Sequence, residues 1–327
     1  MRLHQQVRRI YELYQKTNNL GLLITDGPHS DTQDLQLPVF RWFNRFLKGE
    51  DPPIEMAAKR FFDPQQLRVF ETLPPDQLNT RIQQIFPSTG STNSQATRAP
   101  DLQVLRDSVF GGWPEDESSI TPELVAKEDR QGIRRRHYTL TTQTGVELSL
   151  IVLQDSKVRK PREVVLEVLD STSWTNSAAS FLWLGGETVQ GIAELRQTMQ
   201  HDRCALAFFA PRLVEPAKAF SDKAKWNQIR RRYMLLGQTL DGMRVWDIRC
   251  GAQALKSLPE FRNTRLVLRA QGPMGVNAAY AALFEPQVSR LELSAMPSSH
   301  MEGPDYLGVL RFTDISNVLA ALGDRLK

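Results

Sequence analysis

The chain has 327 residues, of which 41% are hydrophobic and 24% are charged, and its formal net charge is +4. This composition is typical of a folded globular protein and excludes an intrinsically disordered chain or a fibre. No run approaches the roughly 18–20 consecutive apolar residues of a membrane span, so we expect no membrane partner. The two cysteines, Cys204 and Cys250, exclude a disulfide framework and lack metal-ligand spacing.

The first predicted element is an amphipathic helix over residues 2–17. Its apolar face is formed by Leu3, Val7, Ile10 and Tyr14. The segment has no apolar core of the kind that a secretory signal carries.

The run LGLLIT at residues 20–25 is apolar without alternation, which favours a buried parallel strand. Asp26-Gly27-Pro28 then predicts a turn, and His29 follows in the loop. A second helix is expected from near Leu37, with Pro38 in its first turn and Gly49 at its C-terminal cap.

A change in composition divides the chain. The stretch PSTGSTNSQATRAP at residues 87–100 has no apolar run and is rich in Ser, Thr, Gly and Pro, which indicates a linker. We therefore predict a first piece over residues 1–86, a linker over residues 87–105 and a second, larger piece over residues 106–327.

The second piece begins with a predicted hairpin, whose arms at residues 138–141 and 146–153 flank Thr144-Gly145. Buried strands are expected at residues 164–169, 204–210, 265–270 and 288–295, with a helix over residues 243–258 before the third of them. Strands that alternate with helices indicate an α/β fold, with helices on a mostly parallel sheet.

Two arginine clusters are evident, Arg134-Arg135-Arg136 and Arg230-Arg231-Arg232. They would suit phosphate groups, and the alternative interpretation is solvated arginines along exposed faces. No zinc finger, helix-turn-helix or aromatic platform accompanies them, so we expect no nucleic-acid partner. Phosphate-binding loops, H-E-x-x-H, C-x-x-C and G-x-G-x-x-G are absent as well, and we expect no cofactor and no metal.

His29 is the first candidate catalytic residue. It follows the carboxyl end of a predicted strand, which is where open α/β sheets present their functional groups. A triad histidine takes the proton of the nucleophile. The alternative interpretation is an ordinary surface-loop histidine.

A second candidate lies in the segment RLVLRAQGPMG at residues 265–275, which is followed by a small-residue helix. A strand, a glycine-rich turn and a helix form the context of a nucleophile elbow. Aligning Gly275 with the end of an extended G-x-S-x-G-G pattern places Gly272 at the nucleophile position, followed by Pro273. Because glycine has no side chain, this elbow is degenerate.

His300, in PSSHMEGP at residues 297–304, is a third candidate. It could belong to a site in the second piece, but no nucleophile accompanies it. A hydrogen-bonded loop histidine is the alternative interpretation.

Several longer segments together resemble the α/β-hydrolase superfamily, in particular bacterial acetyl xylan esterase-like proteins with two hydrolase-like domains in tandem. In the first piece the resemblance covers LGLLITDGPHSDTQ at residues 20–33, PVFRWFN at residues 38–44 and LKG at residues 47–49. In the second piece it covers APR at residues 210–212, RRRYMLLG at residues 230–237, GMRVWD at residues 242–247 and HMEGP at residues 300–304.

The resemblance implies a carboxylic-ester hydrolase ancestry, with acetylated polysaccharide or a small ester as the substrate, and it implies export of the longer proteins. His29 would be the triad histidine of a first domain of which residues 1–86 form a C-terminal fragment. Since the triad order is Ser, acid, His, the nucleophile and the acid of that domain would precede Met1. The chain is therefore expected to be truncated relative to such proteins.

The second domain is expected to be degenerate and incomplete. Gly272 replaces its nucleophile, and Leu213-Val214-Glu215 stands where such proteins have a glycine-bearing loop. We expect a pseudoenzyme that is inactive alone, since loss of triad members leaves only residual catalysis. The alternative is a non-catalytic interaction or carbohydrate-contact module.

Overall fold

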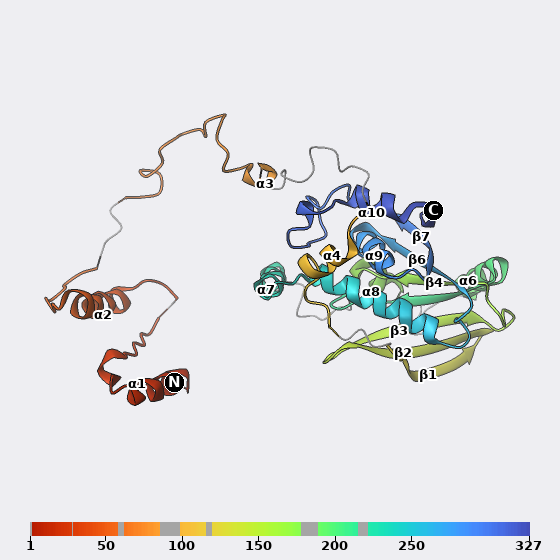
Figure 1. The fold of residues 1–327 in the computed structure, drawn as a ribbon, viewed down its shortest axis with the longest axis horizontal. Helices are drawn as coiled ribbons and strands as arrows, with labels where there is room; N and C mark the ends of the chain where they lie inside the picture. The colour runs from red at the N-terminus through yellow and green to blue at the C-terminus, as the bar shows by residue number, and fades with distance from the viewer. Residues whose placement is uncertain are drawn as a thin grey trace. The chain divides into compact units, whose positions relative to one another are not determined.

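The computed structural model describes residues 2–27, 29–57, 62–85, 99–115, 120–177, 189–214 and 222–327. The chain divides into two compact units, Met1–Gln77 and Leu78–Lys327 (Figure 1). Residues 86–98, which include most of the predicted linker, lie outside the described residues. The boundaries at residues 86 and 105 therefore stay predictions.

The first unit consists of helices and extended chain. Helix α1 spans Arg2–Leu13 and helix α2 spans Gln33–Phe43. A π-helical turn over Asn44–Lys48 continues α2 and ends at Gly49, whose φ of 72° confirms the predicted left-handed cap. Pro38 lies inside α2 rather than in its first turn, because the helix begins four residues earlier than predicted.

The predicted strand at residues 20–25 is wrong in this structure, which has extended chain there without strand pairing. Leu22, Leu23 and Ile24 are exposed. An apolar run forms a strand only when a neighbouring strand satisfies its backbone groups, and no strand is present among the described residues of the first unit.

The second unit is built on a seven-stranded sheet in the order β1-β2-β3-β5-β4-β6-β7. The strands are β1 (Glu123–Arg130), β2 (Ile133–Gln143), β3 (Val146–Asp155), β4 (Glu163–Val168), β5 (Cys204–Phe209), β6 (Arg265–Gln271) and β7 (Val288–Ser294). The pairings among β5, β4, β6 and β7 are parallel, and those that join β1, β2, β3 and β5 are antiparallel. This confirms the predicted α/β class, with an antiparallel extension.

The helices of this unit are α3 (Ile82–Ile85), α4 (Leu102–Ser108), α5 (Ser171–Ser177), α6 (Val189–Asp202), α7 (Lys223–Leu235), α8 (Leu240–Ser257), α9 (Gly272–Phe284) and α10 (Ile315–Leu322). Helix α8 matches the helix predicted over residues 243–258. Thr239 caps it by accepting a hydrogen bond from the Gly242 N–H at 2.9 Å.

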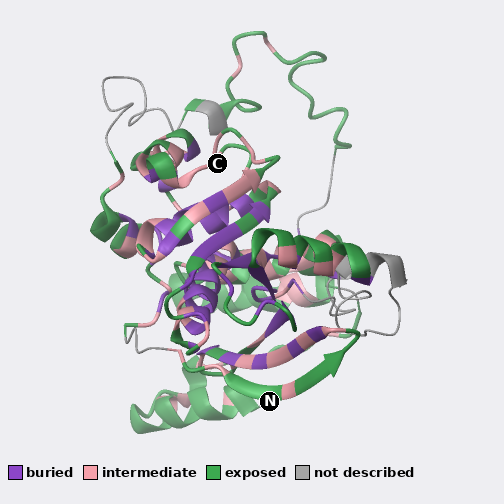
Figure 2. Ribbon diagram, turned by 90° about the vertical axis from the view of Figure 1, so that its right-hand side faces the viewer, coloured by how far each residue is buried: buried purple, intermediate pink, exposed green. Residues whose placement is uncertain are grey.

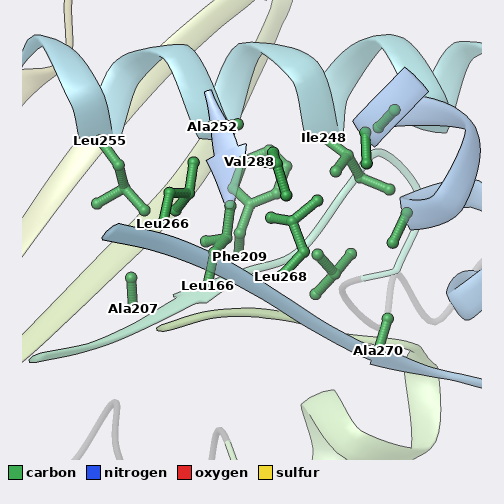
Figure 3. Packing of buried hydrophobic residues seen from close by; sticks show 14 of the residues in the cluster. Leu166, Ala207, Phe209, Ile248, Ala252, Leu255, Leu266, Leu268, Ala270 and Val288 are labelled. Carbon is green, nitrogen blue, oxygen red and sulfur yellow. The ribbon is translucent and has the colours of Figure 1, made fainter. Parts of the chain in front are cut away.

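The core lies between the sheet and the pair α8 and α9. Figure 3 shows Ile248, Ala252 and Leu255 of α8 lying over the strands, which contribute Leu166, Leu266 and Leu268. Helix α9 buries a run of small residues, so it can approach its neighbours closely.

Strands β4 and β5 were predictable because almost all of their residues are buried, which gives an unbroken apolar run. Strand β1 was not predicted: seven of its eight residues are exposed and one is intermediate (Figure 2). Its sequence, ELVAKEDR, therefore carries no burial signal of period two.

Candidate functional site

The strand order places the candidate site at the carboxyl edge of the parallel strands. The chain passes from β4 to β5 on one side and then returns past β4 to β6 on the other, so the order reverses between β4 and β6. Open α/β sheets bind ligands at such a switch point. Here β4 leads to Asp170 and β6 leads to Gln271 and Gly272.

Asp170 is held at this edge by hydrogen bonds. The N–H and the hydroxyl of Ser173 both donate to Asp170 Oδ1 at 2.7 Å, which fixes the start of α5. Burial raises the pKa of Asp170, but hydrogen bonds from Ser173, Thr172 and Gln271 outweigh burial and leave the pKa below its usual value. The carboxylate is therefore ionised and already occupied.

Gly272 is the first residue of α9, and its φ of 57° lies in the left-handed region. The order of strand, left-handed residue and helix is the backbone context of a nucleophile elbow. A Cβ at Gly272 would meet no atom within 4 Å, whereas a Cβ at Gly275 would lie 2.9 Å from Met296 Cγ. Position 272 has room for a side chain and has none, so no nucleophilic atom stands at this apex. Its assignment as a lost nucleophile position stays a prediction.

His300 lies in the loop after β7 and is half-buried. Its Nδ1 is 3.3 Å from the Pro304 carbonyl oxygen, and its Nε2 is 2.8 Å from the Tyr280 hydroxyl. A carbonyl oxygen only accepts, so Nδ1 donates to Pro304 and Nε2 accepts from Tyr280. Burial lowers the pKa of His300, against the opposing effects of the Pro304 carbonyl and Asp314.

The network around His300 continues into α9. The Tyr306 hydroxyl donates to Asn277 Oδ1 at 2.5 Å, and Asp314 Oδ1 accepts from the His300 N–H at 2.9 Å. Asn277, Tyr280 and Tyr306 are all buried. Both ring nitrogens of His300 are engaged, which is the geometry of a histidine that anchors a loop. The sequence could not show this, because Tyr280 lies twenty residues away.

His29 lies in a bend of the first unit, and its side chain is exposed. No hydrogen bond of its ring is found among the described residues. Its role as a triad histidine stays a prediction.

Acidic partners within the second unit neutralise several of the clustered arginines. Arg134 pairs with Asp129, Arg135 with Glu128 and Arg136 with Glu260. On a strand, side chains alternate between faces, so these three arginines do not form one patch. In the second cluster, Arg230 of α7 donates a hydrogen bond to the carboxylate of Asp305.

One feature that sequence analysis missed is the anchoring of the segment after β5. Asp247 of α8 is fully buried and accepts from Arg212 Nε at 2.8 Å, Arg212 Nη2 at 2.7 Å and Thr142 Oγ1 at 2.9 Å. Arg244 donates to the carbonyls of Arg212 and Leu213. Glu215, which belongs to the expected loop position 213–215, lies outside the described residues.

Within the described ranges, no group of three or more His, Cys, Asp or Glu side chains is arranged to hold a metal ion. In the same part of the chain, no helix is long and apolar enough to cross a membrane.

Comparison with known proteins gives a structural likeness without a sequence match. No family model matches the sequence, and no curated protein matches it. A Bacteroides fragilis protein assigned provisionally as an acetyl xylan esterase superposes with a TM-score of 0.51 at 13% identity, over 72% of each chain. The chain shares the α/β fold of this protein.

Two glucuronoyl esterases are also similar, although less so. The enzyme from Solibacter usitatus gives a TM-score of 0.41 at 15% identity and covers 58% of this chain and 55% of its own. The enzyme from Teredinibacter turnerae gives a TM-score of 0.41 at 13% identity, and the match covers 69% of this chain and 64% of that enzyme. At such identities the likeness concerns the fold alone, and the function has to be argued from the site.

Proposed function

We propose that this chain is a pseudo-esterase: an α/β-hydrolase-fold protein that contacts carbohydrate esters without cleaving them. The observation that carries the proposal is Gly272, which occupies the left-handed apex between β6 and α9 and offers no oxygen or sulfur. Acyl transfer through this fold needs a nucleophile at that apex and a base that can reach it.

The surroundings of the apex support the same conclusion. The histidine on the following loop, His300, has its Nε2 lone pair occupied by the Tyr280 hydroxyl. Asp170 is held by Ser173 and by the side chain of Gln271. Neither residue has the free position that a general base requires.

The likeness to the Bacteroides fragilis protein supports the class of ligand. That protein is provisionally an acetyl xylan esterase, so an acetylated polysaccharide or a small ester is the ligand that we propose for this chain.

The test is a hydrolysis assay on the purified full chain with p-nitrophenyl acetate and with acetylated xylan, together with labelling by a fluorophosphonate probe. We expect neither turnover above background nor covalent labelling. Turnover that His29→Ala abolishes would overturn the proposal, because His29 would then belong to a working site.

A second candidate function is supported by the first unit, in which Ala57 is the only buried residue among those described. The apolar face of α1, with Leu3 and Ile10, is exposed, as are Trp42 and Phe43 of α2. Such exposure marks a protein interaction surface. The test is co-purification of the full chain with a partner at a defined stoichiometry. Loss of that partner when residues 1–77 are removed would favour this interaction role.

A further inference from the structure

A cavity of about 370 Å³ lies at the carboxyl edge of the sheet, beside β5. Three elements line it: residues 145–148 at the start of β3, residues 210–213 after β5, and Tyr233 of α7. Because β3 runs antiparallel to β5, its first residues lie at the same edge as the carboxyl end of β5. The volume is within the range of small-molecule sites, about 300–1,000 Å³.

One wall of the cavity is rigidly built. Asp247 accepts hydrogen bonds from the Arg212 N–H and from its guanidinium, and Arg244 holds the carbonyls of Arg212 and Leu213. Leu213 adopts a φ of 58°, in the left-handed region. A leucine keeps this conformation only when its surroundings impose it, and such residues concentrate at ligand-binding positions.

The charges around the cavity disfavour an anionic ligand. The guanidinium of Arg212 is neutralised by the buried carboxylate of Asp247. Glu147 is exposed and has no ion-pair partner among the described residues, so its negative charge is free to act on a ligand. A carboxylate only accepts hydrogen bonds, and it therefore favours a ligand that carries hydroxyl donors and no negative charge.

The remaining surfaces suit a ligand with an apolar face. Tyr233 is half-buried and lies close enough to the guanidinium of Arg212 to interact with it. Val146, Leu148 and Pro211 add apolar surface. A pyranose ring combines both properties, because its C–H face packs on an aromatic ring while its hydroxyl groups donate to a carboxylate.

We propose that this cavity binds one uncharged sugar residue of a polysaccharide, with the ring against Tyr233 and its hydroxyl groups donating to Glu147. The proposal rests on the proposed function for the class of ligand, and it adds the position of the site and the selection of neutral over acidic sugars. The site lies at β5 and is separate from the apex at Gly272, which follows β6.

The test is a titration of the full chain, by isothermal calorimetry, with three probes: xylotetraose, trigalacturonate and n-butylamine. We expect saturable binding of xylotetraose alone. Tyr233→Ala should weaken this binding about tenfold, or about 1.4 kcal/mol, since it removes the aromatic surface against which the sugar ring packs. Tyr233→Phe keeps the ring and should stay within about threefold of the original affinity.

The carboxylate has its own matched pair of variants. Glu147→Gln should weaken xylotetraose binding and relax the rejection of trigalacturonate. Glu123→Gln removes an exposed carboxylate on β1 that does not line the cavity and should change neither. Both positions are exposed, so we expect folding to be preserved. Near-ultraviolet circular dichroism of every variant measures this.

The outcomes separate this proposal from the pseudo-esterase proposal. Three results would overturn the sugar site: unchanged xylotetraose binding in Tyr233→Ala, binding of n-butylamine alone, or no binding by any probe. None of them would contradict the proposal that the chain does not hydrolyse esters. Ester hydrolysis together with Tyr233-dependent sugar binding would overturn the pseudo-esterase proposal and would support the sugar site.

Discussion

At the scale of single residues, Gly272 is the position where the backbone of the second unit follows the strand, left-handed turn and helix of a nucleophile elbow. Its φ of 57° is the conformation that glycine adopts without steric penalty. A Cβ built at this position meets no atom within 4 Å, so a larger side chain would fit there. The missing side chain therefore reflects the residue type and not a crowded site.

We predict that Gly272→Ser folds but gains no esterase activity. A serine in the left-handed region is destabilising by about 1 kcal/mol, which corresponds to a melting temperature lower by roughly 2–4 °C for a unit of this size. Activity stays at background because Nε2 of His300, the histidine nearest in sequence to the apex, accepts from Tyr280. Thermal unfolding and p-nitrophenyl acetate hydrolysis measure the two effects.

Gly275→Ser is the matched control for stability. Its Cβ would lie 2.9 Å from Met296 Cγ, and overpacking of this kind is destabilising by about 1–3 kcal/mol.

A fluorophosphonate probe tests for a nucleophile in Gly272→Ser. If the probe labels this variant and the additional substitution His300→Ala abolishes the labelling, His300 acts as a latent base and the prediction is wrong.

We predict that His300 makes the folded state less stable as the pH falls. Its pKa is lowered in the folded chain, chiefly by burial, so the unfolded chain binds more protons in the interval below the ordinary value of about 6.5. Stability is then lost as the pH falls through about 6.5, and the loss is complete below the folded-state pKa. Urea unfolding at about pH 7.5 and pH 5 should show a smaller difference in His300→Gln than in the original chain. An equal difference in the two proteins would contradict the prediction.

At the scale of elements, the buried ion pair between α8 and the segment after β5 is the main polar connection of the carboxyl edge. Asp247 is fully buried and Arg212 is 7% exposed, and three hydrogen bonds from Arg212 reach the Asp247 carboxylate. Removing one partner of such a pair leaves a buried charge uncompensated.

We predict that Asp247→Ala lowers the free energy of unfolding by about 3–5 kcal/mol. Asp305→Ala breaks the half-exposed pair with Arg230, whose side chain is 40% exposed, and should lower it by at most about 1 kcal/mol. Equilibrium denaturation of both variants measures the contrast. Similar values for the two variants would show that the Arg212–Asp247 pair does not anchor this segment.

The elements that the sequence predicted well are those whose burial is determined locally. Strands β4, β5, β6 and β7 match their predicted ranges within a residue or so, because each is a short apolar run that ends in a turn. The run at residues 20–25 has the same local signal, but the described residues of its unit form no strand beside it, so the prediction was wrong there.

The candidate site was predictable only in part, for a related reason. The Gly272 turn is a local pattern and was visible as spacing. The cavity beside β5 joins residues 145–148, 210–213 and Tyr233, and the pair of Arg212 with Asp247 spans 35 positions. Such groupings arise from the order of strands in the sheet, which a single sequence does not state.

At the scale of the whole molecule, the two units differ in what holds them together. The second unit has a continuous buried core over the sheet and over helices α8, α9 and α10. In the first unit Ala57 is the only buried residue among those described, and Arg41 with Asp51 forms a pair on an exposed surface. Apolar burial is the dominant stabilising contribution to a fold, so only the second unit has the means for independent stability.

We predict that limited trypsin digestion of the native chain cuts first within residues 2–77 and leaves a resistant fragment that begins near residue 99. Proteolysis requires local opening, which takes little free energy where few side chains are buried and much more within a packed sheet. Mass spectrometry of the time course identifies the cuts. A chain that starts at residue 99 serves as the control. It should unfold cooperatively within a few degrees of the full chain, because no described residue before Leu105 belongs to the buried core of the second unit. Survival of residues 2–77 as a compact fragment while the second unit is degraded would contradict this account and would mean that the first unit buries its apolar side chains in a fold of its own.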